Sequence, residues 1–198
     1  TKDSAGQQRT DAAASISPAA AVTVIASDIG AYISGSTVAA AGEIDLDALS
    51  GQTIVALAGG LSGAGANNSK NGYAIAGGGS AVVNVVDINV ESSISDALID
   101  GIDTASTVSS SYGTISVNAA DSSFIGSFAG GLGISFAGGN ERAASAALGA
   151  AVNVNIVDTA VSSYIKGSRA TAHGVDDETG LGVEVKAAAD TDIWTASI

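Results

Sequence analysis

The stretch of sequence at residues 152–165 occurs in three copies, and this recurrence constrains the fold more than any other feature. Its segment Val154–Val157 aligns with Val83–Val86 and with Val22–Ile25, and the match continues downstream in each copy. The copies are offset by 61 and 71 residues. Self-similarity over such a length is the signature of a repeat protein, in which neighbouring units stack and bury a continuous core.

The recurrence divides the chain into a lead-in and three units that form one continuous structural domain. The lead-in, residues 1–21, is polar and then Ala-rich, with Pro18 near its end. The units are residues 22–82, residues 83–153 and residues 154–198, of which the last is truncated.

Segments rich in β-branched residues recur in every unit, bounded by Gly, Asn, Asp and Ser, which is typical of short β-strands. Val22 and Ile33 are 11 residues apart, and the equivalent pairs in the other units keep this spacing. When Ile54 is aligned with Ile115, the ten additional residues of the second unit fall in the Gly-rich passage 124–142. That passage is therefore expected to be a connection that absorbs differences in length.

The sequence predicts an all-β fold, and in particular a parallel β-solenoid (β-helix) built from about three sequence repeats. A sandwich or a barrel would also accommodate short strands. At roughly 20 residues for each circuit of the chain, one repeat corresponds to about three circuits. Stacking of the units places Val22 near Val83 and Val154, in columns that are expected to line the interior.

Two local signals concern other elements. A short helix is expected over Asn140–Ala151, because Asn140 suits an N-cap and Glu141 suits the positive end of a helix dipole. Hairpins are not expected, because neither Asn71-Gly72 nor Asp100-Gly101 separates two convincing strands.

Composition limits the partners. The chain has 7 basic and 20 acidic residues, a formal net charge of −13, whereas binding to nucleic acid requires a basic surface. An anionic membrane surface is disfavoured for the same reason, and the longest uncharged runs are too rich in Gly, Ser and Asn for membrane insertion. The chain has no Cys, which excludes disulfides and thiolate zinc sites.

Three alternating carboxylates, Glu43, Asp45 and Asp47, form the candidate metal site. Side chains two residues apart on a strand lie roughly 7 Å apart on one face, and carboxylate oxygens suit calcium. A solvated strand face is the more common outcome of such a row. The acidic segments 96–103 and 176–178 invite the same interpretation, and no cofactor other than calcium is suggested.

The residues typical of catalysis do not form a recognisable constellation. His173 is the only histidine, and no Gly-x-Ser-x-Gly motif accompanies it. Trp194 and Tyr164 could stack on sugar rings, although single aromatic residues more often pack locally. The chain is therefore predicted not to be an enzyme.

Asparagine recurs inside the repeated strand at Asn84, Asn153 and Asn155. Stacked Asn side chains can hydrogen-bond from one circuit to the next as a structural ladder, but outward-facing polar alternation fits the pattern equally well. The apolar residues expected to stack beside Asn84 and Asn155 are Val83, Val85, Val154 and Ile156.

These motifs cover nearly all of residues 22–198: a Gly/Ala-rich lead-in, Val-Asn-Val-Asn or Val-Val-Asp, a short Ser-Ser-x-Ile strand, and a later Gly-x-Val-x-Val-x-Ala-Ala. The pattern resembles the repetitive passenger region of large bacterial surface proteins, namely filamentous-haemagglutinin-like adhesins and leukotoxin-type filamentous adhesins. The resemblance implies a β-helical stalk outside the cell, at the bacterial surface, without catalytic residues.

Ordinary repeat strands stand near both ends of the chain, which favours end-to-end association with copies of itself or with the rest of a parent filament. A filament of this kind would contact a host or cell-surface glycan or protein. The alternative function is a fragment of a β-helical secreted toxin or carbohydrate-active enzyme.

Overall fold

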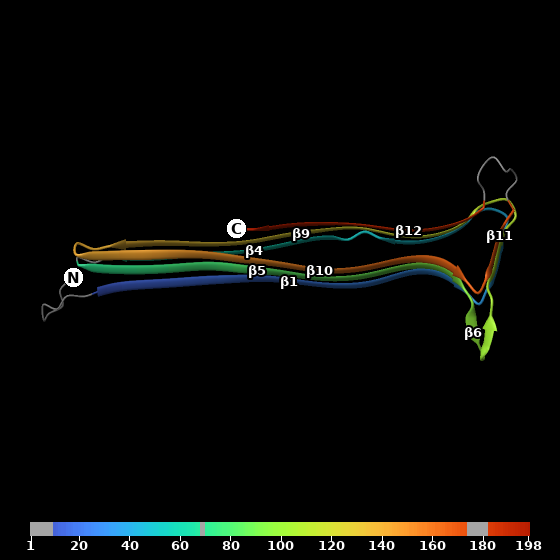
Figure 1. The fold of residues 1–198 in the computed structure, drawn as a ribbon, viewed down its shortest axis with the longest axis horizontal. Helices are drawn as coiled ribbons and strands as arrows, with labels where there is room; N and C mark the ends of the chain where they lie inside the picture. The colour runs from blue at the N-terminus through green and yellow to red at the C-terminus, as the bar shows by residue number, and fades with distance from the viewer. Residues whose placement is uncertain (1–9, 68–69, 174–181) are drawn as a thin grey trace.

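The computed structural model describes residues 10–67, 70–173 and 182–198, and these residues form strands and their connections without any helix. The expected all-β fold with parallel strands is confirmed. Three strands of 25 residues each lie side by side in one sheet (Figure 1). They are β1 (Thr10–Ser34), β5 (Asn71–Ser95) and β10 (Arg142–Lys166), in the order β1-β5-β10.

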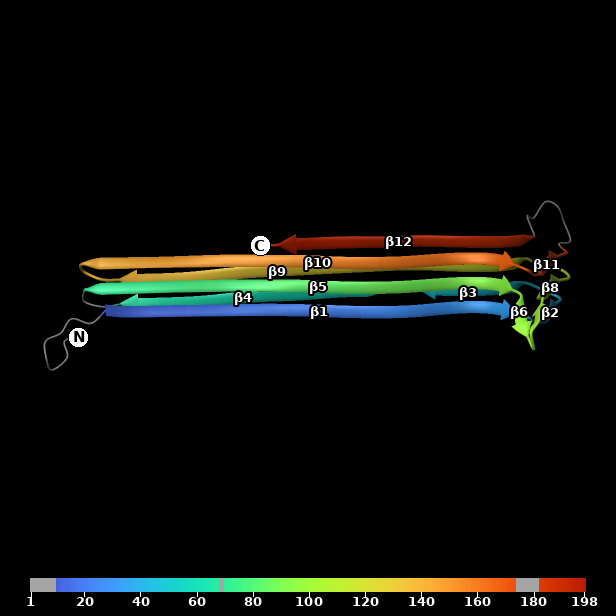
Figure 2. The same ribbon diagram turned by 60° about the horizontal axis from the view of Figure 1, so that its bottom comes forward.

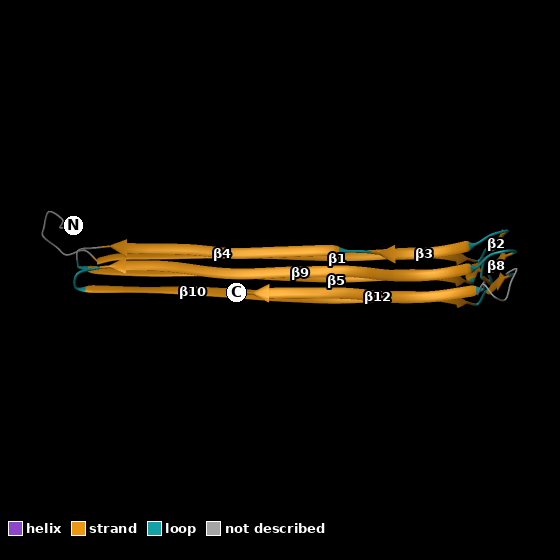
Figure 3. Ribbon diagram, turned by 90° about the horizontal axis from the view of Figure 1, so that it is seen from above, coloured by secondary structure: helices purple, strands orange, loops and turns teal. Residues whose placement is uncertain are grey.

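A second sheet runs along the first, and short strands cross between the two sheets at one end (Figures 1 and 2). The second sheet contains β3 (Ile44–Ser50), β4 (Thr53–Asn67), β9 (Ile115–Gly138) and β12 (Val183–Ser197). The crossing strands are β2 (Thr37–Ala40), β8 (Thr107–Ser110) and β11 (Arg169–Ala172). The view in Figure 3 shows the strands of successive repeats in parallel rows.

Each sequence repeat makes a single circuit of the chain, not three. Val22 pairs with Val83, and Val83 pairs with Val154, so the offsets of 61 and 71 residues are the distances between adjacent parallel strands. The expectation of short strands was wrong because Gly- and Ala-rich passages such as 59–79 looked like connections. Residues 59–67 continue β4 and residues 71–79 begin β5. A residue without a bulky side chain fits a strand wherever the two sheets lie close together. Residues 10–21, expected as a lead-in, are the first half of β1.

Nine of the ten additional residues of the second repeat lie in the corner after β5 and the tenth lies after β8, so none lies in the passage 124–142. Two residues separate β1 from β2, whereas eleven separate β5 from β8, and one further residue lies between β8 and β9. The alignment of Ile54 with Ile115 was also wrong, because Ile115 pairs with Ile44 and Ile54 pairs with Ile125.

The inserted residues form an antiparallel hairpin of β6 (Ala97–Ile99) and β7 (Ile102–Thr104). Its two-residue turn is Asp100-Gly101, with φ angles of 51° and 80°. Positive φ at both positions is the conformation of a type I′ turn, for which Asp-Gly is a preferred sequence. The expectation that this dipeptide forms no hairpin was therefore wrong, because strands of three residues are too short for a pattern of alternation to appear.

The valine columns exist, but they face outward. Val22 is 70% exposed, and Val83 and Val154 lie on the same outer face of the first sheet. The inward positions are the odd-numbered residues of β1 and β10 and the even-numbered residues of β5. Because apolar residues occupy both faces of these strands, periodicity does not show which face is buried, and the expected interior position was wrong.

The core changes in side-chain size along the strands. Near the crossing strands it contains Leu46, Ile94 and Ile115, and further along it contains Ile88 and Ile125. The far end is packed with alanines, among them Ala64, Ala66, Ala74 and Ala76. The two sheets accordingly lie closer together at this end, on the left of Figure 1.

Glycine replaces alanine where the sheets are closest. A Cβ atom added at Gly60 would overlap the carbonyl oxygens of Gly79 and Ser17, and one added at Gly78 would overlap those of Leu132 and Gly60. Equivalent overlaps recur one circuit higher, at Gly131 and Gly149. We call this region the glycine seam, and in it the backbones of the two sheets are in direct contact.

The helix expected over Asn140–Ala151 does not form. Most of this segment is the start of β10, which pairs with β5 from Arg142 onward. Helix propensity of an Ala-rich sequence is a weak prior, and here a continuous parallel ladder overrides it.

No helix within residues 10–67, 70–173 and 182–198 has the length and apolarity to cross a membrane. The acidic segment 176–178 and the polar residues 1–9 lie outside the described residues.

The glycine seam predicts opposite outcomes for two adjacent residues. Gly60→Ala should lower the free energy of unfolding by about 1–3 kcal/mol or more, because the new methyl group must displace backbone atoms. Gly59→Ala should change it by less than about 1 kcal/mol, or raise it, because a Cβ there meets nothing within 4 Å. Urea unfolding followed by circular dichroism measures both. Equal effects of the two substitutions would contradict the seam.

Candidate functional site

The predicted calcium ligands lie at the outer surface of the second sheet. Asp45 and Asp47 are exposed, and Glu43 directly precedes their strand. Their neighbours on β9 are Ser116 and Asn118, and the Asn118 amide lies 3.4 Å from Asp47 Oδ1. Within the part of the chain that the structure describes, no three His, Cys, Asp or Glu side chains are grouped as a metal site. Calcium binding at this row stays a prediction.

The other residues singled out from the sequence lie apart from one another. His173 follows β11, is exposed, and donates its backbone N–H to the Ser110 carbonyl oxygen at 2.9 Å. Trp194 is exposed on β12, and Tyr164 lies on the outer face of β10. These side chains do not converge on a common cleft.

The asparagines of the repeated strand point inward. Asn84 is fully buried, and its Nδ2 donates to Asn155 Oδ1 at 2.7 Å across adjacent circuits. Asn155 Nδ2 continues the chain of hydrogen bonds to Ser127 Oγ, at 3.1 Å on the opposite sheet. The third position of this column is Thr23. Of the stacked apolar pairs beside them, Val83 with Val154 and Val85 with Ile156 are in register on the outer face.

Serine residues that the sequence reading did not use also link the sheets. Ser92 Oγ donates to the Leu46 carbonyl oxygen at 2.8 Å, and Ser163 Oγ donates to the Val117 carbonyl oxygen at 2.6 Å. The donors are in register with each other, and so are the acceptors. The recurrence of Ser-Ser in the repeated motif was the available signal. It was missed because serine is also common in turns.

Tyr164 is held by an acid on the adjacent strand. Its hydroxyl donates to Glu91 Oε1 at 2.6 Å, and Ser93 Oγ donates to the same oxygen at 3.1 Å. The hydrogen bond to Glu91 raises the pKa of Tyr164, because deprotonation would remove the donor and place two negative charges together.

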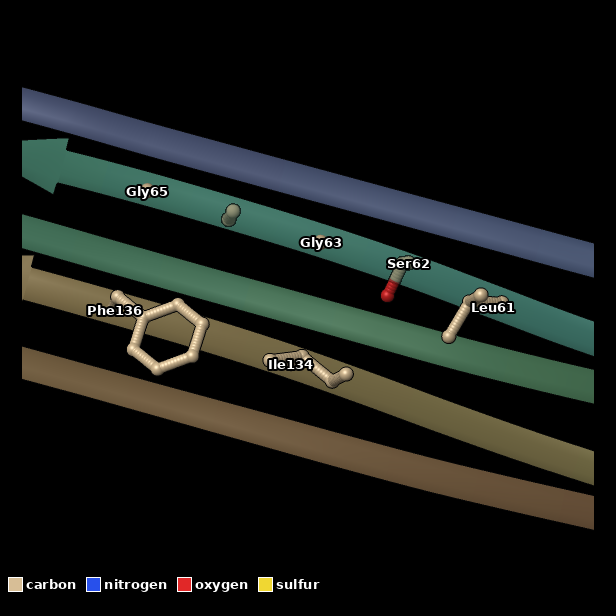
Figure 4. Close-up of a pocket in the computed structure, with 7 residues that line it drawn as sticks. Leu61, Ser62, Gly63, Gly65, Ile134 and Phe136 are labelled. Atoms are coloured by element: carbon tan, nitrogen blue, oxygen red, sulfur yellow. The ribbon is translucent and has the colours of Figure 1, made fainter.

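A further surface feature is an apolar face on the second sheet. We call it the ridged face: the outward side chains of β4 from Thr53 to Asn67 and of β9 from Phe124 to Gly138. Figure 4 shows Leu61 on one strand and Ile134 and Phe136 on its neighbour, with bare backbone at Gly63 and Gly65. A second groove follows the column Gly59 and Gly130. Neither strand contains a charged residue over these ranges.

The asparagine ladder predicts a non-additive pair of substitutions. Asn155→Val should destabilise the fold by about 1–3 kcal/mol, because it leaves the buried Asn84 amide without its acceptor. The double substitution Asn84→Val and Asn155→Val should cost less than the sum of the two singles, because both buried amides are removed together. Urea unfolding of the four proteins measures the coupling, and strictly additive effects would exclude a ladder.

The contact between Tyr164 and Glu91 predicts a shift in titration. Because the folded-state pKa of Tyr164 is raised, the hydrogen bond is present at neutral pH and is lost as pH rises through that raised value. Glu91→Gln should bring the pKa of Tyr164 back toward its ordinary range. Ultraviolet difference titration, with Tyr164→Phe to identify the signal among the four tyrosines, measures the pKa. An unchanged pKa in Glu91→Gln would contradict the assignment.

A scan against protein-family models, a search of curated proteins and a search of solved structures each find no match to this chain.

Proposed function

We propose that the chain is a segment of a parallel β-solenoid and that it serves as a non-catalytic structural or adhesive part of a long bacterial extracellular filament or surface adhesin. The observation that carries the proposal is the open ladder at both ends of the stack. β1 and β10 are the edge strands of the 25-residue sheet, and among the residues that the structure describes no strand pairs with the outer side of either.

The side chains at these ends support addition of further circuits. Val86 and Val90 of the middle circuit are 1% and 0% exposed. Their counterparts in the lower circuit, Ile25 and Ile29, are only partly buried, although they occupy the same columns. Another circuit stacked below would complete the burial of these isoleucines, at about 25 cal/mol for each Å² of apolar surface removed from water.

The distribution of polarity also suits a filament in an extracellular setting. The net charge of −13 opposes unspecific aggregation. Repeated main-chain hydrogen bonds supply stability that small extracellular domains otherwise obtain from disulfides. The proposed partners are copies of the chain or the rest of a parent filament, together with a host or cell-surface glycan or protein.

The direction of the edge hydrogen-bond donors gives a specific test. Gly35, which follows β1, donates its N–H to Ser95 of the neighbouring circuit. Since N–H groups alternate sides along a strand, even-numbered residues of β1 direct theirs to the open edge. Pro18 fits this pattern, because proline in a sheet is confined to positions that donate to no neighbour.

The double substitution Val22→Pro and Ala26→Pro should therefore preserve the fold while blocking growth at the β1 edge. Val22→Thr and Ala26→Thr is the matched control, since it keeps both N–H groups and strand propensity. Sedimentation velocity and electron microscopy at rising concentration should show an open-ended series of oligomers for the original chain and the control, but not for the proline variant. An original chain without this series, or a proline variant that still grows, would overturn end-to-end stacking.

A further inference from the structure

The ridged face is built of columns that run along the stacking direction. Leu57 and Phe128 form one ridge, and Leu61 and Leu132 form the next. Gly59 and Gly130 lie between them and leave a groove with a bare floor, which Ile198 of the third circuit bounds at one end. Successive columns are about 7 Å apart, because outward residues recur every second position along a strand.

The order of ridges and grooves is self-complementary about the column of Gly60 and Gly131. A two-fold rotation about an axis along that column, parallel to the stacking direction, places a second copy face to face with the first. The strands of the two copies then run in opposite directions. Large side chains then meet glycines in six of the eight facing pairs. These pairs are Val55 with Gly65, Leu57 with Gly63, Gly59 with Leu61, Phe124 with Gly138, Gly126 with Phe136, and Gly130 with Leu132.

The two remaining pairs are compatible with the same arrangement. Thr53 faces Asn67, which sets a hydroxyl against an amide, and Phe128 faces Ile134, which sets two apolar side chains together. A two-fold interface requires this kind of self-complementarity, because each surface must fit its own copy.

Charge on the molecule permits a second copy at this face, although it opposes contact between copies elsewhere. The protein carries −13 overall, so two copies repel each other over most of their surfaces. The two strands of the ridged face carry no charge, whereas Asp45 and Asp47 lie at the other end of the same sheet and Asp192 of β12 is paired with Phe124, at the border of the face nearer that end. Reversal of the strands places the two acidic ends at opposite ends of the pair, where their repulsion is smallest.

The area is sufficient for a reversible dimer. From strand geometry, the two strands cover about 48 Å by about 10 Å, so two copies would bury about 1,000 Å² in total. This is the lower limit of specific interfaces.

We propose that the ridged face binds the ridged face of a second copy, with the ridge of Leu61 and Leu132 in each copy seated in the groove of Gly59 and Gly130 in the other. The pairing is lateral and closed at two copies. It leaves the ends of the stack free and gives both stacks the same direction of growth.

The test uses the complete chain with Val22→Pro and Ala26→Pro, which separates lateral pairing from end-to-end stacking. Sedimentation equilibrium in this background should show a monomer–dimer equilibrium. Gly59→Leu should weaken the dimer at least tenfold, because the partner's Leu61 loses its groove. Its own fold should be preserved, since the added side chain points into open space.

The exchange of the two residues is the sharper test. Gly59→Leu together with Leu61→Gly restores a large side chain opposite glycine in that facing pair, and the dimer should return to within about threefold of its original affinity. Leu61→Lys should abolish the dimer. Ala120→Lys, on the outer face of β9 beyond the ridged face, and Gly30→Lys, on the outer face of the opposite sheet, should leave it unchanged.

Three results would overturn the proposal. The first is a protein that stays monomeric in the proline background at every concentration. The second is a Gly59→Leu variant that associates as tightly as the original chain, which would indicate unspecific apolar association. The third is flotation with phosphatidylcholine vesicles that Gly59→Leu strengthens, without a dimer in solution, which would assign the face to lipid.

Discussion

The parallel, in-register pairing of β1, β5 and β10 is the constraint on which the remaining structure depends. Because the three strands pair residue for residue over 25 positions, whatever occupies a position in one circuit lies directly beside its counterpart in the next. The asparagine pair Asn84 and Asn155 can hydrogen-bond only under this condition. The same condition turns single glycines into continuous grooves and single leucines into ridges.

Register also explains which features were predictable from the sequence. The stacking of Val22, Val83 and Val154 followed from the repeat offsets alone, because adjacent circuits must align their recurring residues. Strand length did not follow, since the Gly- and Ala-rich passages have the composition of connections. They are strands because the opposite sheet lies so close that its backbone fills the place of side chains. The sequence does not show which face of the valine segment points inward, because both faces of that segment are apolar.

The positions of the candidate functional residues depend mainly on contacts between the two sheets, which the sequence pattern does not show. The inward position of Asn84 depends on the packing of the opposite sheet, which periodicity does not contain. The serine contacts of Ser92 and Ser163 reach across to the other sheet, so they depend on a pairing between segments 46 residues apart in sequence. The ridged face depends on two strands, and the Gly-rich parts of both were read as connections. Recurrence along the chain shows which residues are neighbours in adjacent circuits of one sheet. It carries little information about which residues of the opposite sheet they contact.

The hairpin of β6 and β7 shows how such an array can acquire new parts. The second circuit holds ten more residues than the first, yet β5 stays in register with β1 and with β10 over their whole lengths. The corner between the long strands and the crossing strands therefore decouples changes in loop length from the geometry of the scaffold. Evolution, or an engineer, can vary what is displayed at that corner in one circuit without redesigning any other, and a tall stack would present such variable loops in a single row.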